Sequence, residues 1–246
     1  MRVQVCGPIV VEDHDKRIEN DLPSRQGRLL FVYLVVNRDR EVPRSEVIDA
    51  LWPQGGPGDA DGALNALLSR LRRALGPNRV VGRTTVRLAL GDDVTVDLED
   101  ADEAIRRAES AVVQGEWERA WAASLVTMFV AKRGFLPGED AEWIDRVRRH
   151  LHDLHIRSLE SYGTAGLGLG GTELAAARNA GRTLVEMVPL RESGHRLLMS
   201  VLAAEDNIAE ALRAYENLRC LLRDELGVSP SDSSQQLYEQ LVAGGR

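Results

Sequence analysis

The sequence predicts an α+β domain at the N-terminus followed by an all-α helical domain. Short apolar runs separated by glycine and proline alternate with helix-like segments up to about residue 96, and after residue 97 the pattern is almost purely helical. Aromatic residues make up only 4% of the chain, so leucine, alanine and valine must fill the core, which favours packing between helices. We therefore place a first domain at 1–96 and a second at 97–246.

The first domain is expected to contain two strands, three helices and further strands. The strands are predicted at 2–5 and 9–11, with a turn or hairpin at 12–21. The helices are predicted from Ser24 to about 37, from about 43 to 52, and from Ala60 to a stop at Gly76, with strands at 80–81, 86–90 and 94–96. This order is typical of a winged helix-turn-helix with an added N-terminal strand.

The second domain is expected to consist of helices at 100–114, 117–130, 140–163, 172–187, 191–204, 207–226 and 231–243. Five positions recur after 34 residues, the tetratricopeptide period: Leu174, Ala175, Ala177, Ala180 and Leu184 return as Ile208, Ala209, Ala211, Ala214 and Leu218. The echo predicts a tetratricopeptide-like domain, although generic helix hairpins can mimic it. Glycine-rich residues 166–171 are predicted to form a flexible turn between helices. Trp117, Trp121 and Trp143 are expected in the core of this domain.

Charge is distributed unevenly between the two domains. The chain has a formal net charge of −7, but residues 1–96 carry 14 arginines and lysines against 13 acidic residues, and the rest carries 17 against 25. A nearly neutral first domain can still bind phosphates if its arginines share one face.

The third predicted helix has two different faces. Leu64, Leu67, Leu68, Leu71 and Leu75 fall on one side at spacings of three and four, which indicates a face packed on a core. The opposite side carries Gly62, Asn65, Ala66, Ser69, Arg70 and Arg73, with Arg72 on the flank. Arginine suits guanine edges and phosphates because its planar fork donates two hydrogen bonds. A solvated helix face is the competing interpretation, and the preceding Gly/Pro loop and following hairpin favour a role in binding.

Several motifs together resemble one family of regulators. They are Leu-Trp-Pro at 51–53, Ser-Arg-Leu-Arg-Arg-Ala-Leu-Gly at 69–76, Phe-Leu-Pro-Gly at 135–138, Glu-Trp-Ile at 142–144, Pro-Leu-Arg-Glu at 189–192 and Asp-Glu-Leu-Gly-Val-Ser-Pro at 224–230. The chain resembles, over nearly its whole length, the Streptomyces antibiotic regulatory protein family. In that family an OmpR-type winged helix precedes a bacterial transcriptional activation domain.

The resemblance implies a DNA-binding surface. The third helix would enter the major groove, with Asn65, Ala66, Ser69, Arg70 and Arg73 facing bases or phosphates and Arg72 on the DNA backbone. The wing around Arg83, Thr84 and Thr85 would reach a minor groove or phosphates, and Arg44 and Ser45 would contact phosphates, with Arg25 and Arg28 as further candidates. Thr85 and Val86 replace the usual Gly-Tyr pair of the wing, and Ala66 replaces a larger polar group. We therefore predict no residue-by-residue base code.

The predicted function is sequence-specific activation of transcription. By resemblance, the protein would bind direct repeats in double-stranded promoter DNA, form a homodimer on DNA, recruit RNA polymerase holoenzyme and control a biosynthetic gene cluster of secondary metabolism. The loop at 53–58 could contact the polymerase or simply join two helices. The alternative is a tetratricopeptide-like interaction scaffold whose winged domain does not bind DNA.

Other classes of function lack a supporting pattern in the sequence. His150, His152 and His155 share a helix but no spacing completes a metal site, and no arrangement for nucleophilic or acid–base catalysis is visible. We expect no enzyme activity, cofactor or metal. Cys6 and Cys220 are expected to be unpaired thiols of a reducing compartment. The absence of a signal peptide, together with an apolar run at 29–36 too short for a membrane span, predicts a cytoplasmic protein with no membrane partner.

Overall fold

The computed structural model describes residues 1–14, 16–22, 24–91 and 93–244, and these residues cluster into two compact units. The first unit combines Met1–Asp100 with Arg133–Leu151, and the second combines Ala101–Lys132 with His152–Arg246. As predicted, the chain is mostly helical with a small β region in its N-terminal part. The clustering differs from a single cut after residue 96, because residues 133–151 group with the first unit.

A four-stranded sheet brings the start of the first unit together with its residues 95–96. Its order is β3-β2-β1-β7, with β1–β2 and β2–β3 antiparallel and β1–β7 parallel. Val3, Val11 and Val96 are buried on this sheet. The strand predicted at 94–96 therefore joins the N-terminal sheet. The charged stretch predicted as a turn or hairpin at 12–21 contains β3 and a short 3-10 helix. The elements are β1 (Arg2–Gln4), β2 (Val10–Asp13), β3 (Lys16–Arg17), η1 (Glu19–Asp21) and β7 (Thr95–Val96).

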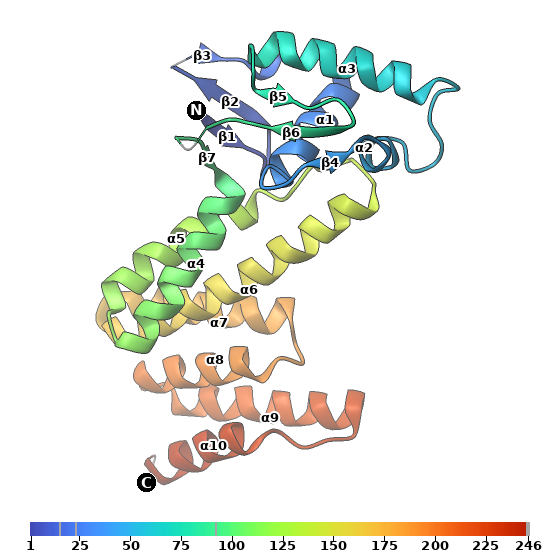
Figure 1. The fold of residues 1–246 in the computed structure, drawn as a ribbon. Coiled ribbons are helices and arrows are strands. Elements are labelled where there is room, and N and C mark those ends of the chain that lie inside the picture. Colours follow the sequence, from blue (N-terminus) through green and yellow to red (C-terminus); the bar gives the residue numbers. More distant parts are fainter. Residues whose placement is uncertain (15, 23, 92, 245–246) are drawn as a thin grey trace. The chain divides into compact units, whose positions relative to one another are not determined.

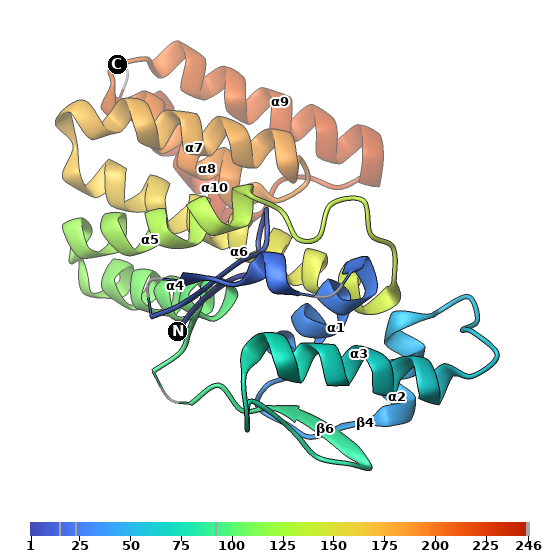
Figure 2. The same cartoon turned by 90° about the horizontal axis from the view of Figure 1, so that it is seen from above.

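Three helices and a second sheet complete the N-terminal part of the first unit. The second sheet has the order β4-β6-β5, and all of its pairs are antiparallel. Helix α1 is buried along most of its length and contacts α2, α3 and β6, so it forms the centre of this unit (Figures 1 and 2). The elements are α1 (Ser24–Val36), β4 (Val42–Pro43), α2 (Arg44–Leu51), α3 (Ala60–Leu75), β5 (Val80–Val81) and β6 (Thr85–Leu88).

Trp143 belongs to the first unit, so its predicted place in the core of the helical domain is wrong. Its indole Nε1 donates a hydrogen bond to the carbonyl of Ala50 at 3.1 Å, and its ring meets Tyr33 edge-on at 5.1 Å between centroids. Arg148 supports the same segment by donating to the carbonyls of Phe135, Leu136 and Glu139 at 3.1, 2.6 and 2.8 Å. These contacts explain why residues 133–151 cluster with the first unit.

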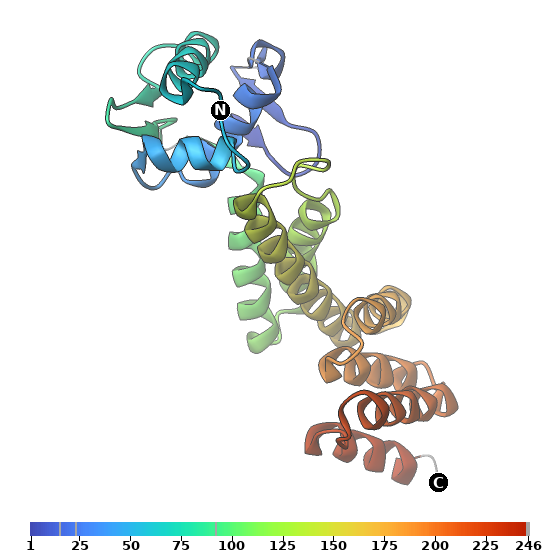
Figure 3. The same ribbon diagram turned by 90° about the vertical axis from the view of Figure 1, so that its right-hand side faces the viewer.

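The second unit is built from helices that pack on their neighbours in sequence. Helices α7, α8, α9 and α10 follow one another as a stack, seen from two sides in Figures 1 and 3. The predicted small residues lie where these helices approach: Ala177 and Ala211 are both fully buried. Among the described residues, no helix has the length and apolar character needed to span a membrane. The helices after residue 96 are α4 (Asp97–Gln114), α5 (Trp117–Lys132), α6 (Glu142–Leu169), α7 (Leu174–Met187), α8 (Glu192–Ala204), α9 (Ile208–Leu226) and α10 (Asp232–Gly244), with a 3-10 turn η2 (Gly171–Glu173). The first residues of α4, up to Asp100, and those of α6, up to Leu151, cluster with the first unit.

The glycine-rich stretch 166–171 is mostly helical, which corrects the predicted flexible turn. Helix α6 continues to Leu169, and only Gly170 and Gly171 take positive φ values at its end. A Cβ at Gly168 would lie 2.5 Å from Cδ2 of Trp117, and one at Gly166 would lie 2.7 Å from Cζ3 of Trp121. These two glycines therefore leave room for the indole rings, which pack in the helical unit as predicted.

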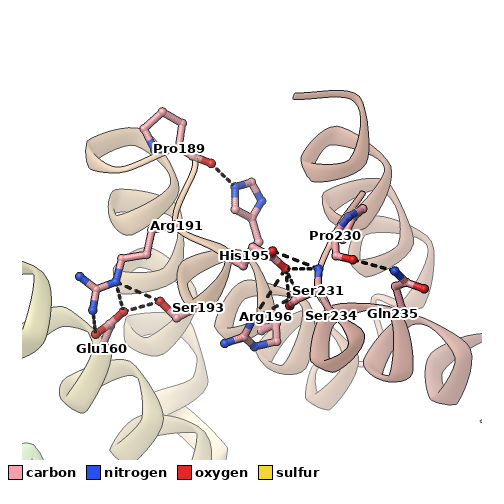
Figure 4. A network of polar contacts seen from close by, with 11 residues as sticks. Glu160, Pro189, Arg191, Ser193, His195, Arg196, Pro230, Ser231, Ser234 and Gln235 are labelled. Atoms are coloured by element: carbon pink, nitrogen blue, oxygen red, sulfur yellow. Dashed lines mark hydrogen bonds and ion pairs between the residues drawn. The ribbon is translucent and has the colours of Figure 1, made fainter. Parts of the chain in front are cut away.

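A network of polar contacts holds the starts of α8 and α10 together (Figure 4). Glu192 accepts hydrogen bonds from the backbone N–H of Ser231 at 3.0 Å and from the hydroxyl of Ser234 at 2.6 Å. Burial by itself would raise the pKa of the Glu192 carboxyl, but the hydrogen bonds from Ser234 and Ser231 outweigh it and hold the pKa below its ordinary value. On the other side, Arg191 and Ser193 point toward Glu160 of α6.

Candidate nucleic-acid interface

Helix α3 has clear start and stop signals. Asp59 caps its N-terminus, because Oδ1 accepts a hydrogen bond from the backbone N–H of Gly62 at 2.8 Å. The helix ends where Gly76 takes a φ of +92°, a conformation that glycine adopts without a steric cost. Both ends agree with the sequence prediction.

A row of leucines sets the rotation of α3 about its own axis. Leu64 and Leu71 have no exposed surface, and Leu67, Leu68 and Leu75 keep at most 7%. Burying five leucine side chains stabilises the packed helix by roughly 1.5–3 kcal/mol each. The opposite face is consequently held outward.

The outward face of α3 carries the predicted polar groups. Asn65, Ala66, Ser69, Arg70 and Arg73 are all exposed. In the part of the chain that the structure describes, no carboxylate forms an ion pair with Arg70 or Arg73. Both guanidinium groups can therefore donate to a partner without first breaking an internal contact, which is what recognition of phosphates or base edges requires.

Arg72, predicted on the DNA backbone, makes contacts within the protein. Its Nε donates to the carbonyl of Val80 at 3.1 Å, and its Nη2 donates to the carbonyl of Gly82 at 3.3 Å. Strand β5 lies at the edge of its sheet. Val80 belongs to this edge strand, and Gly82 follows Val81, the last residue paired with β6. The side chain thus ties the last turns of α3 to the start of the β5–β6 hairpin.

The hairpin between β5 and β6 is tight and presents two of the predicted residues. Gly82 has a φ of +100°, and a Cβ there would lie 2.2 Å from the carbonyl oxygen of Thr85, so only glycine fits. Arg83 and Thr84 are exposed at the turn. Thr85 is half-buried and donates from Oγ1 to Glu41 at 2.8 Å. The threonine at position 85 therefore bonds within the unit.

The start of α2 lies beside both the hairpin and α3. The backbone N–H of Arg44 donates to the carbonyl of Thr84 at 3.4 Å, and its Nη2 donates to Oδ1 of Asn65 at 3.0 Å. Asp61 lies 3.4 Å from the same guanidinium nitrogen. Ser45, next in the chain, is exposed. The structure therefore brings all eleven sequence-predicted residues to α3, the hairpin and the start of α2.

Arg87 is a further exposed arginine of the first unit that the sequence did not single out. It is exposed on β6 between the buried Val86 and Leu88. The alternation of buried and exposed residues along a strand is the signal that would have identified it. Of the two further candidates, Arg28 is exposed, whereas Arg25 pairs with Glu139 through Nε at 2.7 Å.

A polar network beneath α2 orients its first turn. Tyr33 donates from its hydroxyl to Glu46 at 2.6 Å, and Arg40 donates to the same carboxylate. The hydrogen bonds from Arg40 and then Tyr33 lower the pKa of Glu46 to about 2. Burial, followed by the hydrogen bond to Glu46, raises the pKa of Tyr33 to about 12. This network fixes α2 to α1 and thereby fixes the position of Arg44.

The cysteines and the candidate metal-ligating side chains of the described residues do not gather into a second site. Cys6 is buried and Cys220 half-buried, and both are free thiols. Within the described ranges, no group of histidine, cysteine, aspartate and glutamate could hold a metal ion. Burial lowers the pKa of His155, and Lys132 and His152 lower it further.

Comparison with known proteins defines the class of this chain. The family model for the bacterial transcriptional activator domain matches residues 96–242. The chain therefore belongs to the bacterial transcriptional activator domain family. This match confirms the transcription-activator part of the resemblance drawn from the sequence.

Individual relatives agree with this family. The chain is 30% identical over 246 residues to the regulatory protein AfsR of Streptomyces coelicolor, covering 98% of this chain and 24% of AfsR. It is 24% identical to the transcriptional regulator RedD of the same organism, covering 99% of this chain and 71% of RedD. The chain thus spans about a quarter of the length of AfsR.

A solved structure shares the fold. EmbR of Mycobacterium tuberculosis, in complex with a low-affinity phosphopeptide, superposes with a TM-score of 0.83 at 21% identity, covering 99% of this chain and 65% of that one. At this level of identity the likeness extends to the fold alone.

Proposed function

We propose that the chain is a sequence-specific DNA-binding activator whose first unit is a winged helix-turn-helix. In this proposal α3 enters the major groove, the β5–β6 hairpin is the wing, and the start of α2 meets the phosphate backbone. The observation that carries it is the outward face of α3, where Arg70 and Arg73 are exposed without a carboxylate partner among the described residues, above a fully packed leucine row. Arg83, Thr84, Thr85 and Ser45 surround this face.

The proposed partners follow from the family and from the regulators that the chain resembles. The protein would occupy direct repeats in double-stranded promoter DNA as a homodimer, recruit RNA polymerase holoenzyme, and control a biosynthetic gene cluster. Half-sites about one helical turn apart would place the two copies on the same side of the duplex. Recruitment raises the local concentration of polymerase at the promoter and needs no chemistry of its own, which agrees with a non-enzymatic role.

Protein contact by the helical unit is favoured by one exposed surface. Val126 and Phe129 lie three residues apart on α5 and keep 42% and 63% of their surface exposed, and neighbouring exposed apolar side chains mark a contact surface more than single ones do. The same surface keeps the second candidate function open, a tetratricopeptide-like scaffold whose first unit does not bind DNA. Only the behaviour of the first unit toward DNA separates the two.

Binding to duplex DNA as a function of salt tests the proposal. The full chain would be used to select an operator from a random duplex library, and its dissociation constant would be measured from low to physiological salt. A DNA-binding protein should lose affinity steeply as salt rises, because each neutralised phosphate contributes about 0.9 to the slope of log K against log salt. Arg70→Ala with Arg73→Ala should remove most of the affinity.

The matched control removes two arginines from the second unit. Arg106 and Arg213 are exposed on α4 and α9, so Arg106→Ala with Arg213→Ala changes the net charge equally while leaving α3 intact. That variant should bind like the parent protein. Failure to select any duplex, or an equal loss in both double variants, would leave the scaffold as the better hypothesis.

A further inference from the structure

Five arginines surround the proposed DNA-binding face, and they fall into two groups. Arg70, Arg73 and Arg83 are exposed and, over the described residues, none of them forms an ion pair. Arg44 and Arg72 instead donate to named acceptors of the protein. We infer that Arg44 and Arg72 are positioning residues of the interface. Arg44 fixes the orientation of the Asn65 side-chain amide, and Arg72 fixes the position of the β5–β6 hairpin, the proposed wing, relative to α3. The inference rests on the proposed function.

Arg44 determines which way the Asn65 side chain is turned. An arginine has five donors and no acceptor, so the atom of Asn65 that faces Nη2 at 3.0 Å must be the carbonyl oxygen. The amide nitrogen of Asn65 is then turned away from Arg44 on an exposed face of α3. The side chain of Arg44 is itself only 20% exposed, so the group that holds Asn65 is well packed.

This arrangement fixes the orientation of an amide that can hydrogen-bond to base edges. Asparagine discriminates bases through the orientation of its amide, and a flipped amide exchanges donor for acceptor. Without Arg44 the amide of Asn65 would rotate between both orientations and would lose that selectivity. The Arg44 guanidinium also lies 3.4 Å from the Asp61 carboxylate, whose side chain is 73% exposed. This ion pair partly balances the negative charge of Asp61.

Arg72 determines where the wing lies relative to α3. Strand β5 contains only Val80 and Val81, pairs with β6 and packs on α3, with Val80 buried. The Arg72 guanidinium spans the carbonyl of Val80, the first residue of this strand, and the carbonyl of Gly82, which follows its last residue. From the other side of the turn, the N–H of Arg44 holds the carbonyl of Thr84 at 3.4 Å. Arg83 at the tip is thereby held at a set distance from α3.

Double-mutant cycles on the selected operator test the role of Arg72. Arg72→Ala should weaken binding roughly 5- to 100-fold, the range of one lost specific contact, and adding Arg83→Ala should produce no further loss, because the wing contact is already gone. Arg72→Ala and Arg70→Ala should instead multiply their effects. Arg72→Lys keeps the charge but has one nitrogen in place of the separate Nε and Nη2 donors that reach the two carbonyls, so it should behave more like Arg72→Ala than like the parent. Multiplicative losses for Arg72→Ala with Arg83→Ala, or full affinity in Arg72→Lys, would show a direct phosphate contact and overturn the inference.

Base-substituted operators test the role of Arg44. Arg44→Ala should flatten the preference at the one base position where Asn65→Ala also flattens it, and should leave the salt slope unchanged. The two substitutions together should act no more strongly than Asn65→Ala alone at that position. A loss that is uniform over all operators, with a slope reduced by about 0.9, would identify Arg44 as a phosphate contact and overturn this half of the inference.

Two readouts separate failure of the inference from failure of the proposed function. If the parent protein selects no duplex, the proposed function fails and the cycles cannot be started. If the parent binds and Arg70→Ala weakens it while the cycles are multiplicative, only the positioning roles fail. Thermal unfolding of each variant shows whether a loss of binding reflects a loss of fold.

Discussion

Glu46 shows how single residues set the geometry of the first unit. Its carboxylate accepts from the Tyr33 hydroxyl on α1 and from Arg40 in the segment between α1 and β4. Tyr33 also meets Trp143 edge-on, and Trp143 bonds to Ala50 of α2. A few polar and aromatic side chains therefore connect α1, α2 and residues 133–151, and each can be tested alone.

Protonation of Glu46 is expected to weaken the fold in acid. Its folded pKa of about 2 lies below the ordinary value of 4.5, so the stabilisation is complete above pH 4.5 and is lost as pH falls toward 2. Because the side chain is 39% exposed, solvent screens the pair, and we expect Glu46→Gln to cost about 1 kcal/mol at pH 7. Urea unfolding at pH 7 and pH 2.5 should show a smaller difference between parent and variant at the lower pH.

Asp49→Asn is the matched control for this experiment. Asp49 is exposed on the same helix and, among the described residues, has no ion-pair partner. Its substitution should leave the unfolding free energy unchanged at both pH values. A cost of Glu46→Gln that stays constant from pH 7 to pH 2.5 would contradict the assigned pKa.

At the scale of elements, α6 shows that glycine can serve packing inside a helix. Glycine costs a helix interior about 1 kcal/mol relative to alanine, yet α6 contains Gly163, Gly166 and Gly168 before its end at Leu169. The cost is offset by close packing, because the indoles of Trp117 and Trp121 lie where Cβ atoms would be. Trp121 also stacks on Tyr162 of α6 at 3.8 Å between ring centroids.

Gly168→Ala is expected to have opposite effects in two backgrounds. In the parent protein the new methyl would meet Trp117 at 2.5 Å, and displacing the ring should cost about 1–3 kcal/mol. In a Trp117→Ala background the clash is absent, so the helix propensity of alanine should remain and raise stability by up to about 1 kcal/mol. Chemical denaturation of the parent protein, the two single variants and the double variant measures both signs, and a loss of equal size in both backgrounds would contradict the packing role of Gly168.

At the scale of the whole molecule, the compact units do not follow the linear order of the chain. The first unit takes residues 133–151 from the middle of the sequence, after residues 101–132 have contributed to the second. The family model, in contrast, begins at residue 96 and runs to 242 without a break. A segment that belongs to the activator domain by sequence therefore completes the proposed DNA-binding unit by packing.

Trp143 is expected to stabilise helices that lie far from it in sequence. Trp143→Ala removes the indole that packs against Tyr33 and Phe135, and it leaves the Ala50 carbonyl without its hydrogen-bond donor. The free energy of unfolding should fall by about 3 kcal/mol. Hydrogen exchange should show lost protection in α1 and α2 and unchanged protection in α8 and α9. Trp143→Phe, which keeps a ring and loses only the hydrogen bond, should cost about 1 kcal/mol. Unchanged exchange in α1 and α2 would show that residues 133–151 are not part of that unit's stability.

Much of this architecture could be predicted because its signals are local. The bounds of α3 follow from Asp59 and Gly76, and its rotation follows from five leucines at helical spacing. The helices of the second unit follow from the same periodicity and from caps such as Gly227, which takes the left-handed conformation after α9. The exposure of Asn65, Ser69, Arg70 and Arg73 follows from that periodicity as well, although contact with DNA stays a prediction.

The errors arose where a residue's partner is distant in the chain. The sequence predicts the wrong core for Trp143, because nothing near it in the chain points to Ala50 or Tyr33. The composition around Gly166 and Gly168 predicts a turn, because the rings that require glycine there lie in α5. Composition alone cannot distinguish a glycine that allows a turn from a glycine that admits a ring.

By itself the sequence determined the helices, the two faces of α3 and the membership of the family, because periodicity, caps and motifs depend on neighbours within a few residues. Only the tertiary structure decided that Arg44 and Arg72 donate hydrogen bonds within the protein, whereas Arg70 and Arg73 form no ion pair among the described residues, and that residues 133–151 complete the first unit. These features depend on which atoms meet across the fold, and hydrogen-bond acceptors such as the carbonyls of Val80 and Gly82 leave no mark in the side-chain pattern.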